Sequence, residues 1–128
     1  MTQLNNTLYE VTPDKLIIDS SHPIDVKVIS LSANQGTVKR GTVISLTNTA
    51  EYIVFGAALV DPQTSSKANC IIADEVDTTS QAATVTAVAY ISGHYNKNEL
   101  IVKEGSSLAV VDIEDLRNAG IFISSSIN

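Results

Sequence analysis

Tryptophan is absent from the sequence, and Cys70 is its only cysteine. A single thiol cannot close an intramolecular disulfide, and the neighbouring Ile71 and Ile72 favour a packed thiol over a reactive one. His22 and His94 stand far apart in the chain, so no spacing typical of a zinc site occurs. We therefore expect a fold that depends on neither oxidation nor a bound metal or other cofactor.

Basic residues are also scarce. Eight Lys and Arg stand against 14 Asp and Glu, which gives a formal net charge of −6. Without a basic cluster the chain lacks the electrostatic footprint of a protein that binds nucleic acid or an anionic membrane. Lys39 and Arg40 are adjacent, but no glycine-rich loop opens a helix beside them, so they indicate a solvated face and not a phosphate site. We expect no direct nucleic-acid or membrane partner.

Long apolar runs are missing as well. No stretch approaches the length needed to span a bilayer, and the N-terminal residues MTQLNNTLYE have neither a charged n-region nor an apolar h-region. We expect a soluble protein that is made without a secretion signal.

The abundant residues are Val, Ile, Thr, Ser and Ala, a composition typical of strands built from small and β-branched side chains. A single domain of 128 residues buries about two-thirds of the surface that its unfolded chain exposes, which is enough for a core without covalent staples. The sequence predicts an α+β, mostly β fold. We expect a small compact domain of short strands with one short C-terminal helix, preceded by an extended N-terminal arm.

The most regular pattern lies at residues 84–92. Thr, Val, Tyr and Ser occupy one face of an extended chain, while Val, Ala and Ile occupy the other, which predicts a half-buried antiparallel strand. Residues 93–98 are polar and contain Gly and Asn, which suit a turn, and Leu100, Ile101 and Val102 follow as apolar strand formers. We therefore expect a hairpin over residues 84–102.

Weaker patterns predict further strands. Ile24, Val26 and Val28 alternate with Asp25 and Lys27, as in a short strand with one polar face. Residues 51–60 are apolar enough for a buried strand that ends at the following Asp-Pro pair, and residues 63–67 are expected to be a surface loop. A glycine at position 41 predicts a bulge or tight bend, and residues 121–123 predict a final strand.

One short helix is predicted at residues 113–119. Asp112 can serve as its N-cap, Glu114 and Asp115 lie in the first turn, and Gly120 suits the left-handed position after the last turn. Ile113, Leu116 and Ala119 recur at a spacing of three, and we expect them to face the core.

The first 23 residues differ from the rest. They contain two prolines, several Asn and Ser residues and one apolar island, Leu16, Ile17 and Ile18. Such a segment buries little by itself, and two interpretations are open: an extended arm that becomes ordered on another surface, or a frayed terminus with one anchoring cluster. We divide the chain into a mobile arm, residues 1–23, and a single globular domain, residues 24–128.

No catalytic constellation is apparent. Asp74, Glu75 and Asp77 lie close together, but they form no glycine-punctuated calcium loop and have no second acidic cluster as a partner, so a charged turn is the favoured interpretation. The serines lie in no nucleophile elbow, and no acid is placed to orient a histidine as a base. We expect that the protein is not an enzyme.

Four segments carry a family resemblance: GTVKRGTVIS, ANCIIADEVDTT, AVAYISGHYNKNELIV and IEDLRNAGIFI. In this order and at these separations they resemble the phage head decoration proteins of the lambda type. The resemblance covers roughly residues 36–123. Its most specific parts are the acidic turn, the SGHYN segment and the LRNAGI ending of the helix.

The resemblance implies a structural protein of the virion, made in the host cytoplasm. Such a protein forms homotrimers on the outer surface of the mature phage head, at three-fold and quasi-three-fold sites, and binds the major capsid protein. It stabilises the head against the pressure of packaged DNA and has no enzyme activity. The resemblance also implies that the N-terminal arm becomes ordered against capsid subunits by strand addition.

From composition we expect the arm and the first strand to carry the capsid contacts. The candidate capsid-binding residues are Leu16, Ile17, Ile18, Ile24, Val26 and Val28. The alternative function is a virion-surface fibre base or a carbohydrate-binding β-domain. Sugar-binding proteins usually present aromatic platforms, and the absence of tryptophan, with four Tyr and two Phe, argues against it.

Overall fold

The computed structural model describes residues 15–19, 23–57, 65–79 and 84–124. This part of the chain is mostly β, with one short α-helix near its C-terminal end, which confirms the predicted class. In chain order the elements are β1 (Ile17–Asp19), β2 (Val26–Leu31), β3 (Thr37–Val38), β4 (Val43–Thr47), β5 (Tyr52–Val54), β6 (Ser66–Ile72), β7 (Val76–Asp77), β8 (Val85–Tyr90), β9 (Gly93–Asn96), the 3-10 helix η1 (Lys97–Glu99), α1 (Val110–Ala119) and β10 (Ile121–Ser124).

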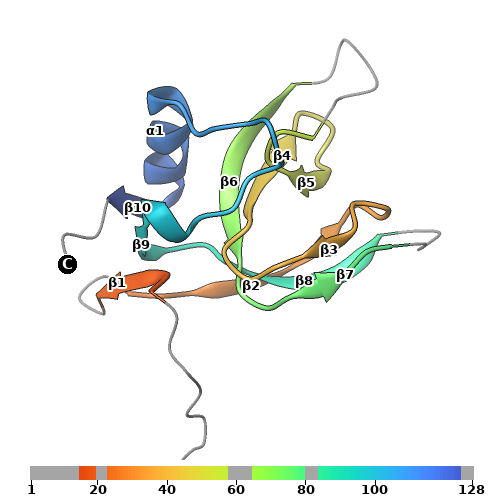
Figure 1. Ribbon diagram of the computed structural model, residues 1–128, viewed down its shortest axis with the longest axis horizontal. Helices are drawn as coiled ribbons and strands as arrows, with labels where there is room; N and C mark the ends of the chain where they lie inside the picture. Colours follow the sequence, from red (N-terminus) through yellow and green to blue (C-terminus); the bar gives the residue numbers. More distant parts are fainter. Residues whose placement is uncertain (1–14, 20–22, 58–64, 80–83, 125–128) are drawn as a thin grey trace, which may run out of the picture.

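Five strands form a closed barrel in the order β2-β5-β4-β6-β8 (Figure 1). The antiparallel ladders β2–β8 and β4–β6 are its longest pairings, and the β4–β6 ladder shifts register between Ile44 and Ser45. The barrel is closed between β2 and β5 by a single residue pair, because these parallel strands pair only at Leu31 and Tyr52. Alternate side chains of the barrel strands point inward and form the core. Its fully buried members include Leu31, Val43, Ile44, Cys70, Ile71, Ile72 and Ala89.

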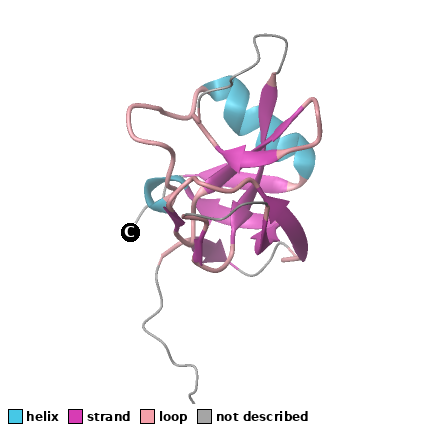
Figure 2. Ribbon diagram, turned by 90° about the vertical axis from the view of Figure 1, so that its right-hand side faces the viewer, coloured by secondary structure: helices cyan, strands magenta, loops and turns pink. Residues whose placement is uncertain are grey.

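A second sheet, in the order β1-β9-β10, lies beside the barrel. β1 runs antiparallel to β9 and β10 runs parallel to it, so segments from both ends of the described chain meet on one central strand. The helix α1 packs against both β10 and β6, and Figure 2 shows it lying along one side of the sheets. Tyr95, Leu116 and Ile121 join this layer to the barrel core.

The hairpin predicted for residues 84–102 is wrong. β8 has the predicted alternation, with Ala87 and Ala89 buried, but its partners are β2 and β6. The segment expected to be a turn is the strand β9 followed by η1, and Tyr95 within it is fully buried. Gly93, at φ 129°, redirects the chain between β8 and β9. The free energy gained by burying the Tyr95 ring favours a strand here, although the segment is otherwise polar.

The helix begins earlier than predicted. It spans Val110–Ala119 with Ala109 as its N-cap, and Asp112 is the third helical residue. The Asp112 carboxylate reaches back to accept the backbone N–H of Ala109 at 2.8 Å, which satisfies one N-terminal donor from inside the first turn. Leu116 is fully buried as predicted, but Ala119 is exposed. The expected end is confirmed, since Gly120 is left-handed at φ 109°.

Two strand boundaries also need correction. The buried strand expected over residues 51–60 is the short, half-buried β5, which ends at a turn containing Gly56 at φ 94°. Residues 58–64, with the predicted terminating Asp-Pro pair, lie outside the described part of the chain. Part of the surface loop expected at residues 63–67 is already strand, because β6 begins at Ser66. The bend predicted at Gly41 is confirmed by its φ of 96°.

The buried thiol of Cys70 gives the fold a pH dependence that can be measured. Burial in the barrel raises the pKa of Cys70 from its ordinary 9.0 to about 12, and the charge of Lys27 offsets this only in part. Above pH 9 the unfolded chain therefore loses a proton that the folded protein keeps, so stability falls as the pH rises toward 12. By pH 10 the free energy of unfolding should be lower by about 1.4 kcal/mol from this group alone.

Urea denaturation at pH 8 and pH 10 measures this effect. The Cys70→Ala variant should lose about 1.4 kcal/mol less stability between these two pH values than the parent protein, because its remaining pH dependence comes from other groups. Equal losses in the two proteins would contradict the buried, protonated thiol.

Candidate binding surface

The acidic residues near β7 form a turn. Asp74 and Glu75 are exposed, and the Asp77 carboxylate accepts the backbone N–H of Thr79 at 2.9 Å. This backbone hydrogen bond is the main reason that the pKa of Asp77 lies below its usual value. Over the described residues, no three His, Cys, Asp or Glu side chains are grouped as metal ligands would be. The geometry fits the charged turn that the sequence predicts.

His94 and Arg40 both have structural partners. His94 lies in β9, and its Nε2 is 2.7 Å from the Ser124 hydroxyl on β10, so it links two strands. Arg40 donates hydrogen bonds to the Tyr90 hydroxyl and to the Ala73 carbonyl, and its guanidinium lies 5.4 Å from the Tyr90 ring centre. The solvated face expected for Arg40 is therefore wrong, because a cation over an aromatic ring has an alternative to water.

The outer face of β2 carries an exposed apolar surface. Ile24 precedes the strand at 37% exposure, and within the strand Val26 and Val28 are 55% and 63% exposed. Their neighbours across the ladder are Tyr90 and Val88 of β8, which are half-buried on the same face. We call these five residues the β2 apolar face. Apolar side chains that gather on one exposed face mark a candidate protein-binding surface.

The six candidate residues divide into two groups. Leu16 is 2% exposed and belongs to the protein's own core, while Ile17 and Ile18 are half-buried in β1 beside β9. Leu16, which was named as a candidate capsid-binding residue, is therefore already packed inside the free protein. Its carbonyl accepts the Asn96 N–H at 2.7 Å, so backbone pairing and burial hold it together. Ile24, Val26 and Val28 are exposed on the outer face of β2. Residues 1–14 and 20–22 of the predicted arm lie outside the described residues.

The orientation of β2 was not apparent from the sequence. The alternation of residues 24–28 predicts a short strand with one polar face, but it does not indicate which face turns toward the core. The strand continues to Leu31, and its buried side chains are Ile29 and Leu31, which alternate with the valines and force Val26 and Val28 outward. The orientation of the strand could have been predicted from the sequence by following the alternation onward to Ile29 and Leu31.

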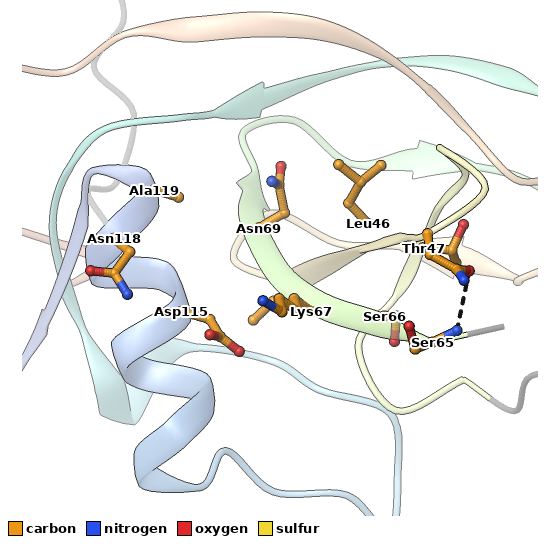
Figure 3. A pocket seen from close by; sticks show the side chains of 11 residues that line it. Leu46, Thr47, Ser65, Ser66, Lys67, Asn69, Asp115, Asn118 and Ala119 are labelled. Carbon is orange, nitrogen blue, oxygen red and sulfur yellow. Dashed lines mark hydrogen bonds between the residues drawn. The ribbon is translucent and has the colours of Figure 1, made fainter.

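A groove of about 460 Å³ separates α1 from β6. Lys67 and Asn69 come from the strand, Asp115 and Asn118 come from the helix, and Figure 3 shows Lys67 and Asp115 extending into the space between them. Ser65 at one end donates its backbone N–H to the Asn48 side chain at 3.2 Å. None of the lining residues is aromatic, so the groove has no stacking platform of the kind that sugar-binding sites use.

A second exposed apolar pair lies at the start of α1. Val110 and Val111 are 78% and 64% exposed, and sequence reasoning missed them because it placed the start of the helix three residues later. Val111 is therefore an exposed valine of nearly the same accessibility as Val28, on a different element.

Comparison with known proteins gives one family match. The model of the family described as Bacteriophage lambda head decoration protein D matches residues 7–121. No curated protein matches the chain significantly. The one α-helix of the described residues is too short and too polar to cross a membrane.

Proposed function

We propose that this chain, which belongs to the bacteriophage lambda head decoration protein family, binds the outside of the mature phage head and cements it. It acts as a homotrimer at three-fold and quasi-three-fold positions, where it holds neighbouring major capsid proteins against the pressure of packaged DNA. The family match over nearly the whole chain carries the proposal, because it identifies a structural protein of the phage head.

The β2 apolar face supplies a physical basis for attachment. Three exposed aliphatic side chains form only a small patch, and burying each contributes about 1 to 2 kcal/mol before the costs of association. One copy would therefore bind weakly. Closed symmetry repeats the same patch three times, and a lattice that matches the trimer converts weak contacts into tight binding.

We keep the division into an arm, residues 1–23, and a domain, residues 24–128, as part of this proposal, with one change. Leu16 and β1 are fixed on the domain, so they set the point from which the preceding residues reach a capsid subunit. Strand addition by those residues, together with the β2 apolar face, forms the contact with the head. Cementing by such contacts requires no cofactor and no catalysis.

Co-sedimentation with heads of the phage that encodes the chain tests the function. Heads lacking their decoration protein are mixed with increasing amounts of the full chain and pelleted. We expect saturable binding and a higher temperature of DNA release from filled heads. An absence of binding, or equal binding to unrelated protein particles, would overturn the proposal.

A pair of charge substitutions tests the β2 apolar face. Val28→Asp places a carboxylate in the patch and should lower head occupancy at least tenfold, about 1.4 kcal/mol or more, since the charge would have to be desolvated on binding. Val111→Asp is the matched control, because the two valines are 63% and 64% exposed, and it should bind like the parent. Equal losses in both variants would rule out a specific role for this face.

A further inference from the structure

We infer that β2 offers an open backbone edge to an extended segment of a head subunit, which adds to the barrel as a further strand. This inference rests on the proposed function and adds a second contact to the strand addition proposed for the arm: at β2 the decoration protein is the acceptor of a strand and not its donor.

The first observation is the unequal pairing of β2. On one side it pairs with β8 along its whole length, from Val26 opposite Tyr90 to Leu31 opposite Val85. On the other side it pairs with β5 only at Leu31. Within the described part of the chain, residues 26–29 thus have no strand paired to their second edge.

The hydrogen-bond pattern shows which amides face that edge. Ile91 donates its N–H to the Asp25 carbonyl at 2.9 Å, so the backbone of Asp25 points toward the β8 side. Antiparallel ladders alternate hydrogen-bonded and non-bonded pairs. The backbone groups of Lys27 and Ile29 therefore also point toward β8, and those of Val26, Val28 and Ser30 point away from it.

Two further bonds support this assignment independently. Ala73 donates its N–H to the Val88 carbonyl at 2.9 Å, so Val88, which lies opposite Val28, directs its backbone toward β6 and not toward β2. Ser32 donates its N–H to the Tyr52 carbonyl at 2.9 Å, which places the even-numbered residues of this segment on the β5 side. The Ser30 carbonyl belongs to the bridge with Tyr52, but the backbone N–H and C=O groups of Val26 and Val28 face an edge that a partner strand can pair with.

The side chains beside the edge also favour an extended strand as the partner. Val26 and Val28 stand on the outer face and are more than half exposed. A strand added to the edge would place alternate side chains next to them. Main-chain pairing would supply the affinity, and packing against the two valines would supply the selectivity for apolar residues at alternate positions.

The occupant that fits best is a segment presented many times on a lattice. The edge is short, so one added strand gains few backbone hydrogen bonds at a modest net value each. We therefore expect the edge to be empty in dilute protein and to fill when several copies bind together. Lys27 is exposed on the opposite face of the strand from the two valines, and a charge at that place is of the kind that discourages edge-to-edge pairing of identical copies. A head subunit meets these requirements better than a second copy does.

Val28→Pro tests the edge directly. Proline removes the Val28 N–H, which does not bond to β8, so the barrel ladder is preserved. Val28→Thr is the matched control: it keeps the N–H and the branched shape but replaces a methyl group with a hydroxyl. We expect Val28→Pro to lower head occupancy at least tenfold and Val28→Thr less than threefold, with unchanged circular dichroism and a Cys70 thiol that stays unreactive in both.

Each outcome of this test has a distinct meaning. If Val28→Pro binds heads like the parent, the edge is not used and the inference is overturned, while the decoration function stands. If Val28→Thr loses as much binding as Val28→Pro, side-chain contact alone explains attachment and the inference again fails. If the parent chain does not bind heads at all, the proposed function itself is wrong.

Hydrogen exchange on the unmodified chain keeps the inference testable even if the proline variant misfolds. Amides in the peptide covering residues 26–31 should exchange faster in free protein than on heads, whereas those of residues 110–119 should change little. If the amides of residues 26–31 exchange slowly in the free chain, and exchange faster once residues 2–14 are deleted, the chain's own N-terminus occupies the edge. If their exchange slows as the protein concentration rises in the absence of heads, a second copy of the chain occupies the edge. Either result would overturn the inference.

Discussion

Replacing Gly93 with alanine should lower the free energy of unfolding by about 3 kcal/mol or more. The backbone of Gly93 has a φ of 129°, which side chains rarely permit. A Cβ at this position would lie 2.7 Å from the Tyr95 hydroxyl oxygen and 2.9 Å from its ring. Tyr95 cannot move aside easily, because it is fully buried and its hydroxyl donates to the Ser92 carbonyl at 2.7 Å.

Gly105→Ala is the control for this prediction. Gly105 also has a positive φ, 89°, but a Cβ there would meet nothing within 4 Å. Gly105→Ala should therefore lower the free energy of unfolding by about 1 kcal/mol, which is the penalty for the backbone conformation without a steric collision. Urea denaturation of both variants at pH 7 measures the difference. Similar losses would mean that the Tyr95 ring does not close the space beside Gly93.

Leu16→Ala should destabilise the free protein by about 3 kcal/mol. Leu16 is almost completely buried, and its side chain packs close to the backbone at Gly41. Removing three carbon atoms leaves a cavity between the barrel and the second sheet, which the rigid strands on either side cannot fill. Ile24→Ala, at a side chain 37% exposed, should cost less than about 1 kcal/mol.

Denaturation of the free protein separates two views of this segment. If Leu16 belongs to the core, its substitution lowers stability in the absence of heads. If the apolar island is a docking strand that waits for the capsid, Leu16→Ala would leave the stability of the free protein unchanged and weaken only head binding. The second result would contradict the burial of Leu16.

Individual strands could be predicted from the sequence better than the strands with which they pair. The alternation at residues 84–92 predicts the strand β8 correctly, because the two-residue period of a strand can be recognised from neighbouring residues. The pairing of β8 with β2 and β6 depends on residues far away in the chain, which no local pattern encodes. The same reason explains why β9 was mistaken for a turn: its neighbours, β1 and β10, come from opposite ends of the described chain.

The candidate surface was found in part. Ile24, Val26 and Val28 were identified as apolar residues near the arm, and the structure exposes all three. Their grouping with Leu16 fails, because hydrophobicity alone does not distinguish a side chain that anchors the fold from one that awaits a partner. That distinction requires the β1–β9 pairing. The open edge of β2 could not be predicted either, since it results from where β5 ends beside its neighbour.

An image reconstruction of phage heads decorated with the full chain tests the central claim most directly. The account predicts density for three copies of the domain at each three-fold and quasi-three-fold position on the outside of the head, with β2 turned toward the shell. Density on the inner surface, single isolated copies, or heads that remain bare at saturating protein would contradict it.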